Sequence, residues 1–100
     1  MAYTTIDDPS AYFHIQLWTG NGSSQTITND ANAGDFSPDW VWIKNRSSSG
    51  GAGPHIIWNT TRTKDREFHL NTTEAEHTTT NGITAFNADG FDLGNGGTVN

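Results

Sequence analysis

The chain has 100 residues, a formal net charge of −6 and no cysteine. This length fits one domain, and the lack of cysteine excludes disulfides, cysteine-based zinc sites and thiol nucleophiles. The acidic balance argues against nucleic acid as a partner, and no apolar run approaches the ~20 residues of a membrane span, so we expect no membrane insertion.

The first part of the chain predicts an arm followed by a strand. We expect residues 1–10 to form an N-terminal arm, because Asp7-Asp8-Pro9 would interrupt a strand there. In residues 11–18, Phe13, Ile15 and Leu17 recur at every second position. This period of two predicts the first strand of a domain that spans residues 11–100.

Short apolar runs separated by turn signals follow along the rest of the chain. They predict strands at residues 25–28, 40–45, 55–59, 66–70, 83–86 and 91–93. The last two flank Asn87-Ala88-Asp89-Gly90, which predicts a β-hairpin with a four-residue loop. Polar segments predict loops at residues 29–34, 47–54 and 71–81. No window keeps apolar residues at helical spacing, so the fold class is expected to be all-β, an antiparallel β-sandwich.

The aromatic residues supply much of the expected core, because only 32% of the residues are hydrophobic. We expect Phe13, Ile43, Trp58 and Phe91 to lie between the facing sheets. Trp42 is also expected in the core, because residues 40–45 carry large apolar side chains on both faces. The tail after Leu93 offers almost no core-forming residue.

Exposed aromatic and basic side chains are the candidates for ligand contacts. Trp18 lies beside the turn Thr19-Gly20-Asn21-Gly22, where an indole ring can stack on a sugar. Trp18, Asn21 and Arg46 are therefore the candidate glycan-binding residues. Basic side chains in this acidic chain have a simpler role, which is to pair with carboxylates such as Asp39 or Asp65.

The acidic residues do not indicate catalysis. Glycoside hydrolysis needs two carboxylates about 5–10 Å apart across a cleft, whereas Glu74 and Glu76 fall in a Thr-rich segment and are interpreted as solvated loop charges. Nucleophile elbows, phosphate-binding loops and dinucleotide fingerprints are all missing from the sequence. We therefore expect a protein that is not an enzyme.

No metal site and no cofactor is expected. The four histidines form no short ligand unit, although His69 and His77 could approach each other across a loop. Three aspartates in polar loops lack acidic partners at calcium-loop spacing, and turns use the same residue types; they are Asp30, Asp35 and Asp89.

Four segments, in order, resemble a family of marine bacteriophage proteins. The most specific is Phe36-Ser37-Pro38-Asp39-Trp40-Val41-Trp42-Ile43-Lys44-Asn45-Arg46. The others are the opening Tyr12 to Gly22, the run Ile57 to Arg62, and the closing hairpin Ile83 to Gly94. The resembling proteins are tail-fibre or other virion-surface components of cyanophage and pelagiphage type. In that family the pattern continues with another aromatic strand, so we expect either more chain beyond Asn100 or a strand supplied by a neighbouring subunit.

The resemblance implies a jelly-roll or concanavalin-like sandwich in a non-enzymatic virion structural protein. It implies a tail fibre that contacts host glycans, made in the host cytoplasm and located in the virion. The partners would be other virion proteins and copies of the chain itself. The alternatives are a capsid decoration protein and a free carbohydrate-binding module.

Overall fold

The computed structural model describes residues 8–30, 35–46 and 53–100. Its described residues form seven strands and one turn of 3-10 helix, η1. In chain order the elements are η1 Pro9–Ala11, β1 Gln25–Thr28, β2 Trp40–Lys44, β3 His55–Asn59, β4 Arg66–His69, β5 His77–Thr78, β6 Ile83–Asn87 and β7 Gly90–Leu93. The expected all-β class is confirmed, and six of the seven predicted strands are present.

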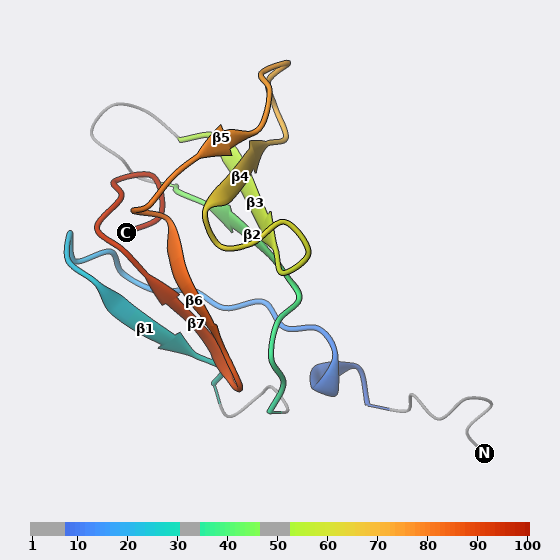
Figure 1. The fold of residues 1–100 in the computed structure, drawn as a ribbon. Coiled ribbons are helices and arrows are strands. Elements are labelled where there is room, and N and C mark those ends of the chain that lie inside the picture. Colours follow the sequence, from blue (N-terminus) through green and yellow to red (C-terminus); the bar gives the residue numbers. More distant parts are fainter. Residues whose placement is uncertain (1–7, 31–34, 47–52) are drawn as a thin grey trace.

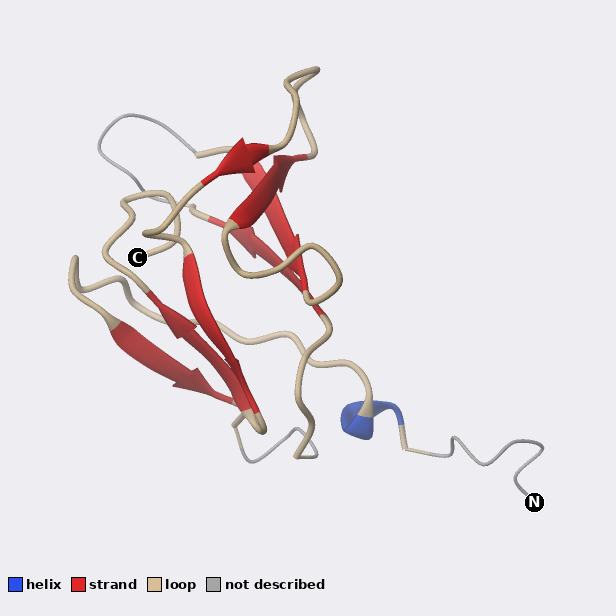
Figure 2. Ribbon diagram, viewed as in Figure 1, coloured by secondary structure: helices blue, strands red, loops and turns tan. Residues whose placement is uncertain are grey.

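The strands form two antiparallel sheets (Figures 1 and 2). One sheet has three strands in the order β1-β7-β6, and the other has four in the order β2-β3-β4-β5. β1 pairs with β7, so the three-stranded sheet joins the two ends of the domain. The remaining pairs follow the chain as successive antiparallel neighbours.

Both sheets contribute to one hydrophobic core, as expected of a β-sandwich. From the four-stranded sheet, alternate residues of β2 and β3 point inward, because successive side chains of a strand face opposite sides. The buried cluster consists of Ile27, Val41, Ile43, Ile56, Trp58, Ile83, Leu93 and Val99. Trp18, Phe86 and Phe91 pack against it while partly exposed. The expected burial of Ile43 and Trp58 is confirmed, and Phe91 lies at the border of the core.

Two expectations for the ends of the domain are wrong. Residues 11–18 do not form the expected strand, because none of the strands that the structure describes pairs with them. Phe13 is therefore 63% exposed instead of buried. The tail does supply a core residue, since Val99 is buried after a turn in which its backbone N–H donates to the carbonyl of Gly96.

The predicted hairpin at residues 83–93 is confirmed with a tighter turn. Asn87 pairs directly with Gly90, which leaves two residues in the loop instead of four. Gly90 has a φ of +133° and lies against β1. A Cβ at this position would approach the carbonyl oxygen of Ile27 to 2.0 Å, so only glycine allows β1 to pair at normal distance.

The loops agree with the sequence only in part. The predicted loop at residues 71–81 contains the short strand β5. Residues 1–7 of the expected arm, 31–34 of the loop after β1, and 47–52 of the Ser/Gly-rich loop lie outside the described residues. Among the described residues, no helix is long and apolar enough to span a membrane.

Candidate functional site

A surface groove lies beside the candidate glycan-binding residues. Its volume is about 490 Å³, and it is lined by residues 16–20, 43–46 and the tail, with Trp18 and Arg46 among them. Trp18 is half-buried, packs edge-to-face on Phe91 at 5.9 Å, and donates from Nε1 to the carbonyl of Val99. Its indole therefore ties the N-terminal segment to the core and is not free to lie flat under a sugar ring.

The other two predicted residues have different surroundings. The side chain of Asn21 accepts a hydrogen bond from the backbone N–H of Ser23, and the backbone N–H of Asn21 donates to Oδ1 of Asn100. This arrangement is typical of a side chain that stabilises a turn. Arg46 is exposed and lines the groove. The structure thus brings Trp18 and Arg46 to one groove, while Asn21 stabilises the turn next to it.

The exposed tryptophans are instead on β2. Trp40 and Trp42 are 49% and 52% exposed, because β2 is an edge strand whose outer face is uncovered. The expected burial of Trp42 is wrong for this reason. The two rings lie 6.0 Å apart, and Nε1 of Trp42 donates to Nδ1 of His55 on β3. Together they form a ridge of aromatic surface, the Trp40–Trp42 pair.

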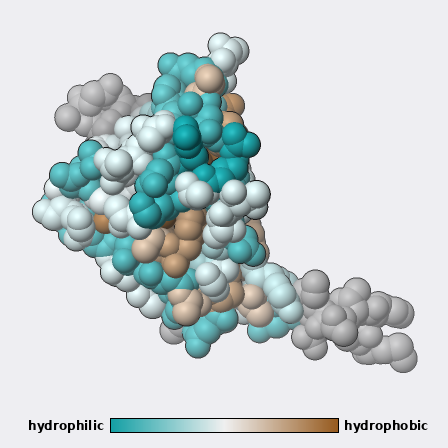
Figure 3. Space-filling view, in the orientation of Figure 1, coloured by the Kyte–Doolittle hydropathy of each residue, from teal (hydrophilic) through white to brown (hydrophobic). Residues whose placement is uncertain are grey.

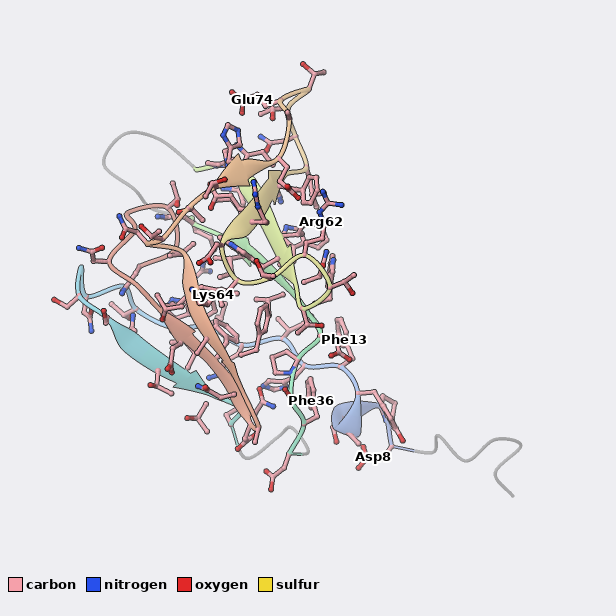
Figure 4. The ribbon with its side chains drawn as sticks, viewed as in Figure 1. Asp8, Phe13, Phe36, Arg62, Lys64 and Glu74 are labelled. Carbon is pink, nitrogen blue, oxygen red and sulfur yellow. The ribbon has the colours of Figure 1, made fainter. Side chains whose placement is uncertain are left out.

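A second apolar surface is formed by the segment that was expected to be a strand. Phe13, Ile15 and Leu17 are 63%, 75% and 71% exposed, and we call them the outward row. The side chains between them contact the rest of the domain. Gln16 donates to the carbonyl of Thr28, and His14 lies 3.2 Å from Asp30. Figure 3 shows hydrophobic surface exposed among polar residues on the face in view, and Figure 4 marks Phe13 on this segment.

Most of the outward row also lies on unpaired backbone, whereas the N–H of Phe13 donates to the carbonyl of Pro9. Residues 14–18 make no backbone–backbone hydrogen bond with any residue that the structure describes. Peptide groups of this kind are open to pairing with another extended chain. The segment thus combines the two features of a docking strand, which are an apolar row and free hydrogen-bonding groups.

Charged and imidazole side chains gather around β4 and β5. Nδ1 of His69 lies 3.2 Å from Oε2 of Glu74, and Nε2 of His77 lies 3.4 Å from the same oxygen. Hydrogen bonds from His69 and then from Thr72 lower the pKa of Glu74. In Figure 4, Glu74 lies on the loop beyond β4 and β5, at the end of the domain farthest from η1. Among the described residues, His69, Glu74 and His77 are the group whose ligand atoms are close enough to share a metal ion.

A second charged group lies beside it. Glu76 pairs with Arg62 and, at 3.7 Å, with Arg66. The hydrogen bond from Arg62 lowers the pKa of Glu76. Arg62 also lies over the ring of Phe68 at 5.0 Å. Glu76 was expected to be a solvated loop charge, but these basic partners enclose its side chain. The expected pairing of Asp65 with a basic side chain is present, and its partner is the neighbouring Lys64.

Sequence reasoning missed the grouping around Glu74 because its signal is not a short motif. His69 and His77 belong to neighbouring strands, so only the register of β4 and β5 brings them together. A prediction of β5 inside the Thr-rich segment would have been needed. The aspartates at 30, 35 and 89 belong to no comparable group within the described part of the chain.

Comparison with known proteins places the chain in a family. The model of a domain of unknown function, DUF7483, matches residues 8–100, and the chain belongs to this family. Neither the curated proteins nor the solved structures contain a match to the chain.

Proposed function

We propose that this member of the DUF7483 family is a non-enzymatic structural domain of a bacteriophage particle, most simply of a tail fibre. The observation that carries the proposal is the outward row on largely unpaired backbone. A domain that acted alone in solution would expose such a segment at a cost in solubility. A subunit of an assembly would cover it with a neighbour.

We propose that the neighbour at this segment is a second copy of the chain. Two extended segments of identical sequence can pair antiparallel about a two-fold axis, which gives each copy the same new contacts. Phe13, Ile15 and Leu17 of one copy would then lie beside those of the other, on the same face of the pair. Two copies that each carry a net charge of −6 repel each other, so apolar contact and main-chain hydrogen bonds would supply the attraction.

The assembly is tested by sedimentation velocity over a range of protein concentrations. We expect the native chain to form dimers or larger species, and the variant Phe13→Ser/Ile15→Ser/Leu17→Ser to remain monomeric. The control Trp40→Ser/Trp42→Ser removes exposed apolar surface elsewhere and should assemble like the native chain. A native chain that stays monomeric at high concentration contradicts the proposed pairing.

Location in the particle needs its own experiment. Antibodies against the purified domain should label intact particles of the virus that encodes it, on the tail if it is a fibre component. Labelling confined to the head would favour the alternative of capsid decoration. A chain found only in infected-cell extract and never in particles would contradict the virion role.

The finer fold expected from the resemblance, a jelly-roll or concanavalin-like sandwich, belongs to the same proposal. It is supported by two antiparallel sheets that share a core and by the pairing of the first described strand with the last. An experimental structure of the assembled form would show whether a neighbour adds a strand beside residues 12–20.

A second candidate function is glycan binding, which the Trp40–Trp42 pair favours. Two half-exposed indoles 6.0 Å apart offer apolar surface to successive sugar rings. If the domain binds host glycans there, Trp42→Ala should abolish binding on a glycan array. Trp18→Ala should reduce binding only if it also disturbs the fold, which circular dichroism would reveal. Binding that is lost with Trp18 or Arg46 in a folded variant, and kept without Trp42, would move the site to the groove.

A further inference from the structure

We propose that His69, Glu74 and His77 form a binding site for Zn²⁺ at the β4–β5 end of the four-stranded sheet. The inference does not depend on the proposed function, because it rests on a different part of the molecule. Two imidazoles and one carboxylate are a ligand set that zinc accepts, with water in the remaining position.

The strand register explains how the two histidines meet. Glu67 of β4 is directly opposite His77 of β5, and His69 is two residues along β4 from Glu67. Residues opposite each other, and residues two apart on one strand, point to the same face of a sheet. All three side chains therefore share one face, and the two imidazole rings lie 4.8 Å apart.

That face is the one that carries the core. His69 pairs with Ile56 of β3, which is fully buried, so His69 points to the inner side of the sheet. The side chains of His69 and Glu67 are only 17% and 14% exposed. Polar side chains on the inner side of a sheet cost stability unless they have partners, and here the partners are one another.

The distances between donor atoms match a tetrahedral ion. Ligands about 2.0–2.1 Å from zinc at tetrahedral angles lie about 3.3–3.4 Å from one another. The contacts from Glu74 to His69 and to His77 measure 3.2 and 3.4 Å. All three ligand atoms lie within 4.8 Å of one another, and binding of an ion would draw the two imidazole nitrogens closer together.

The nitrogen of His77 that faces Glu74 has no other hydrogen-bond partner among the described residues. Nε2 of His77 is shielded from solvent, and it makes no well-aligned hydrogen bond with any described residue. A buried nitrogen without a hydrogen bond costs stability. Coordination of an ion between His77 and Glu74 would give that lone pair a partner.

Glu67 supplies the outer contact that zinc-binding histidines usually have. Nδ1 of His69 faces Glu74, and Nε2 of the same ring lies 3.3 Å from Oε1 of Glu67. A carboxylate at the second nitrogen fixes the tautomer and the orientation of the ring. Glu67 is thus a positioning residue, and Glu74, His69 and His77 are the ligands.

The site would bind the loop to the sheet. Glu74 belongs to the loop between β4 and β5, and it is the most exposed ligand, whereas the histidines belong to the two strands. An ion held by all three would connect the loop to both strands. We therefore expect zinc to raise the thermal stability of the domain, because a ligand that binds only the folded state stabilises it.

The experiment is calorimetric titration of the full chain, without an affinity tag, with ZnCl₂. We expect one ion per chain and a rise in the melting temperature. His69→Ala and His77→Ala should each abolish most of the affinity. Glu67→Gln should weaken binding by about 10–100-fold, as expected for an outer carboxylate. Glu74→Gln keeps the shape of the ligand residue but removes its charge, so a loss of zinc affinity in this variant would not be due to misfolding.

His14→Ala is the matched control. His14 also contacts a carboxylate, at 3.2 Å from Asp30, but it belongs to no group of three ligands among the described residues. Its replacement should leave zinc affinity unchanged. Cobalt(II) provides a spectroscopic test, because a four-coordinate ion absorbs visible light far more strongly than the hydrated ion. The proposal is overturned if the His69→Ala/His77→Ala double variant binds zinc as tightly as the native chain, or if bound cobalt keeps the spectrum of the hydrated ion.

Discussion

Replacing Trp58 by alanine is expected to lower the free energy of unfolding by about 3–5 kcal/mol, as for other large buried aromatics. Trp58 of β3 is fully buried, and it is paired with Val41 of β2 and belongs to the core cluster. Its ring is closely enclosed, since a Cβ on Gly82 would lie 2.6 Å from Cζ2 of the indole. Neighbouring side chains cannot fill the cavity without moving one sheet against the other.

Urea unfolding followed by far-ultraviolet circular dichroism measures this effect without relying on tryptophan fluorescence. A domain of this size has about 5–15 kcal/mol of stability in total, so Trp58→Ala should lose a large fraction of it. Trp42→Ala is the control, because its ring is half-exposed on the outer face; we expect a change within about 0.5–1 kcal/mol. Equal losses for the two variants would contradict the described position of the core.

Trp58→Phe separates packing from polarity. Nε1 of Trp58 is buried and has no hydrogen-bond partner among the described residues. Phenylalanine removes this unsatisfied donor, which offsets part of the volume that is lost. We therefore expect Trp58→Phe to cost much less than Trp58→Ala.

The second large effect is expected at the turn between β6 and β7. Gly90→Ala places a methyl group where the Ile27 carbonyl oxygen lies 2.0 Å away, at a φ of +133° that side chains rarely adopt. The backbone conformation alone costs about 1–3 kcal/mol, and relief of the contact requires β1 to separate from β7. We expect a loss of stability of about 3 kcal/mol or more, in the range found when strain and steric overlap combine.

Gly97→Ala is the matched control for this substitution. A Cβ at Gly97 would meet no atom within 4 Å, and its φ is not in the left-handed region. Its stability should change by less than about 0.5 kcal/mol, as for ordinary surface positions. If Gly90→Ala were as stable as Gly97→Ala in the same urea titration, the close approach of β1 to the hairpin would be wrong.

The sequence predicted best where a pattern is local. Residues 40–44 and 55–59 form strands because β-branched and aromatic residues alternate between turn signals. The turn residues Asn87 to Gly90 likewise indicate the hairpin of β6 and β7. These signals depend on neighbours within a few residues. They need no knowledge of which strand pairs with which.

The errors arise where partners decide the outcome. The alternation of Phe13, Ile15 and Leu17 is real, but none of the described strands pairs with this segment, so its polar side chains anchor it and the apolar ones face outward. Trp42 is exposed because it points to the outer face of β2, opposite to Val41 and Ile43, and no local pattern reveals which face of the strand is covered. Val99 is buried only because the tail folds back beneath Trp18.

The candidate site shows the same limit. Trp18, Asn21 and Arg46 were selected for exposure and residue type, yet Trp18 and Asn21 have structural partners. The group around Glu74 was not selected, although the approach of His69 and His77 was recognised as feasible. Only the pairing of Glu67 with His77 across β4 and β5 brings this group together.

The pairing of β1 with β7 also has a consequence for biosynthesis. β1 is made before all the other strands that the structure describes, yet its one partner among them consists of residues 90–93. During translation β2 and β3 can meet as soon as both leave the ribosome, whereas β1 must wait until residues 90–93 have been made. Contacts between residues so far apart form slowly because the intervening chain must first be ordered. The nascent domain therefore passes through a stage with one sheet formed and Ile27 still in water, when premature association with other chains is most favourable.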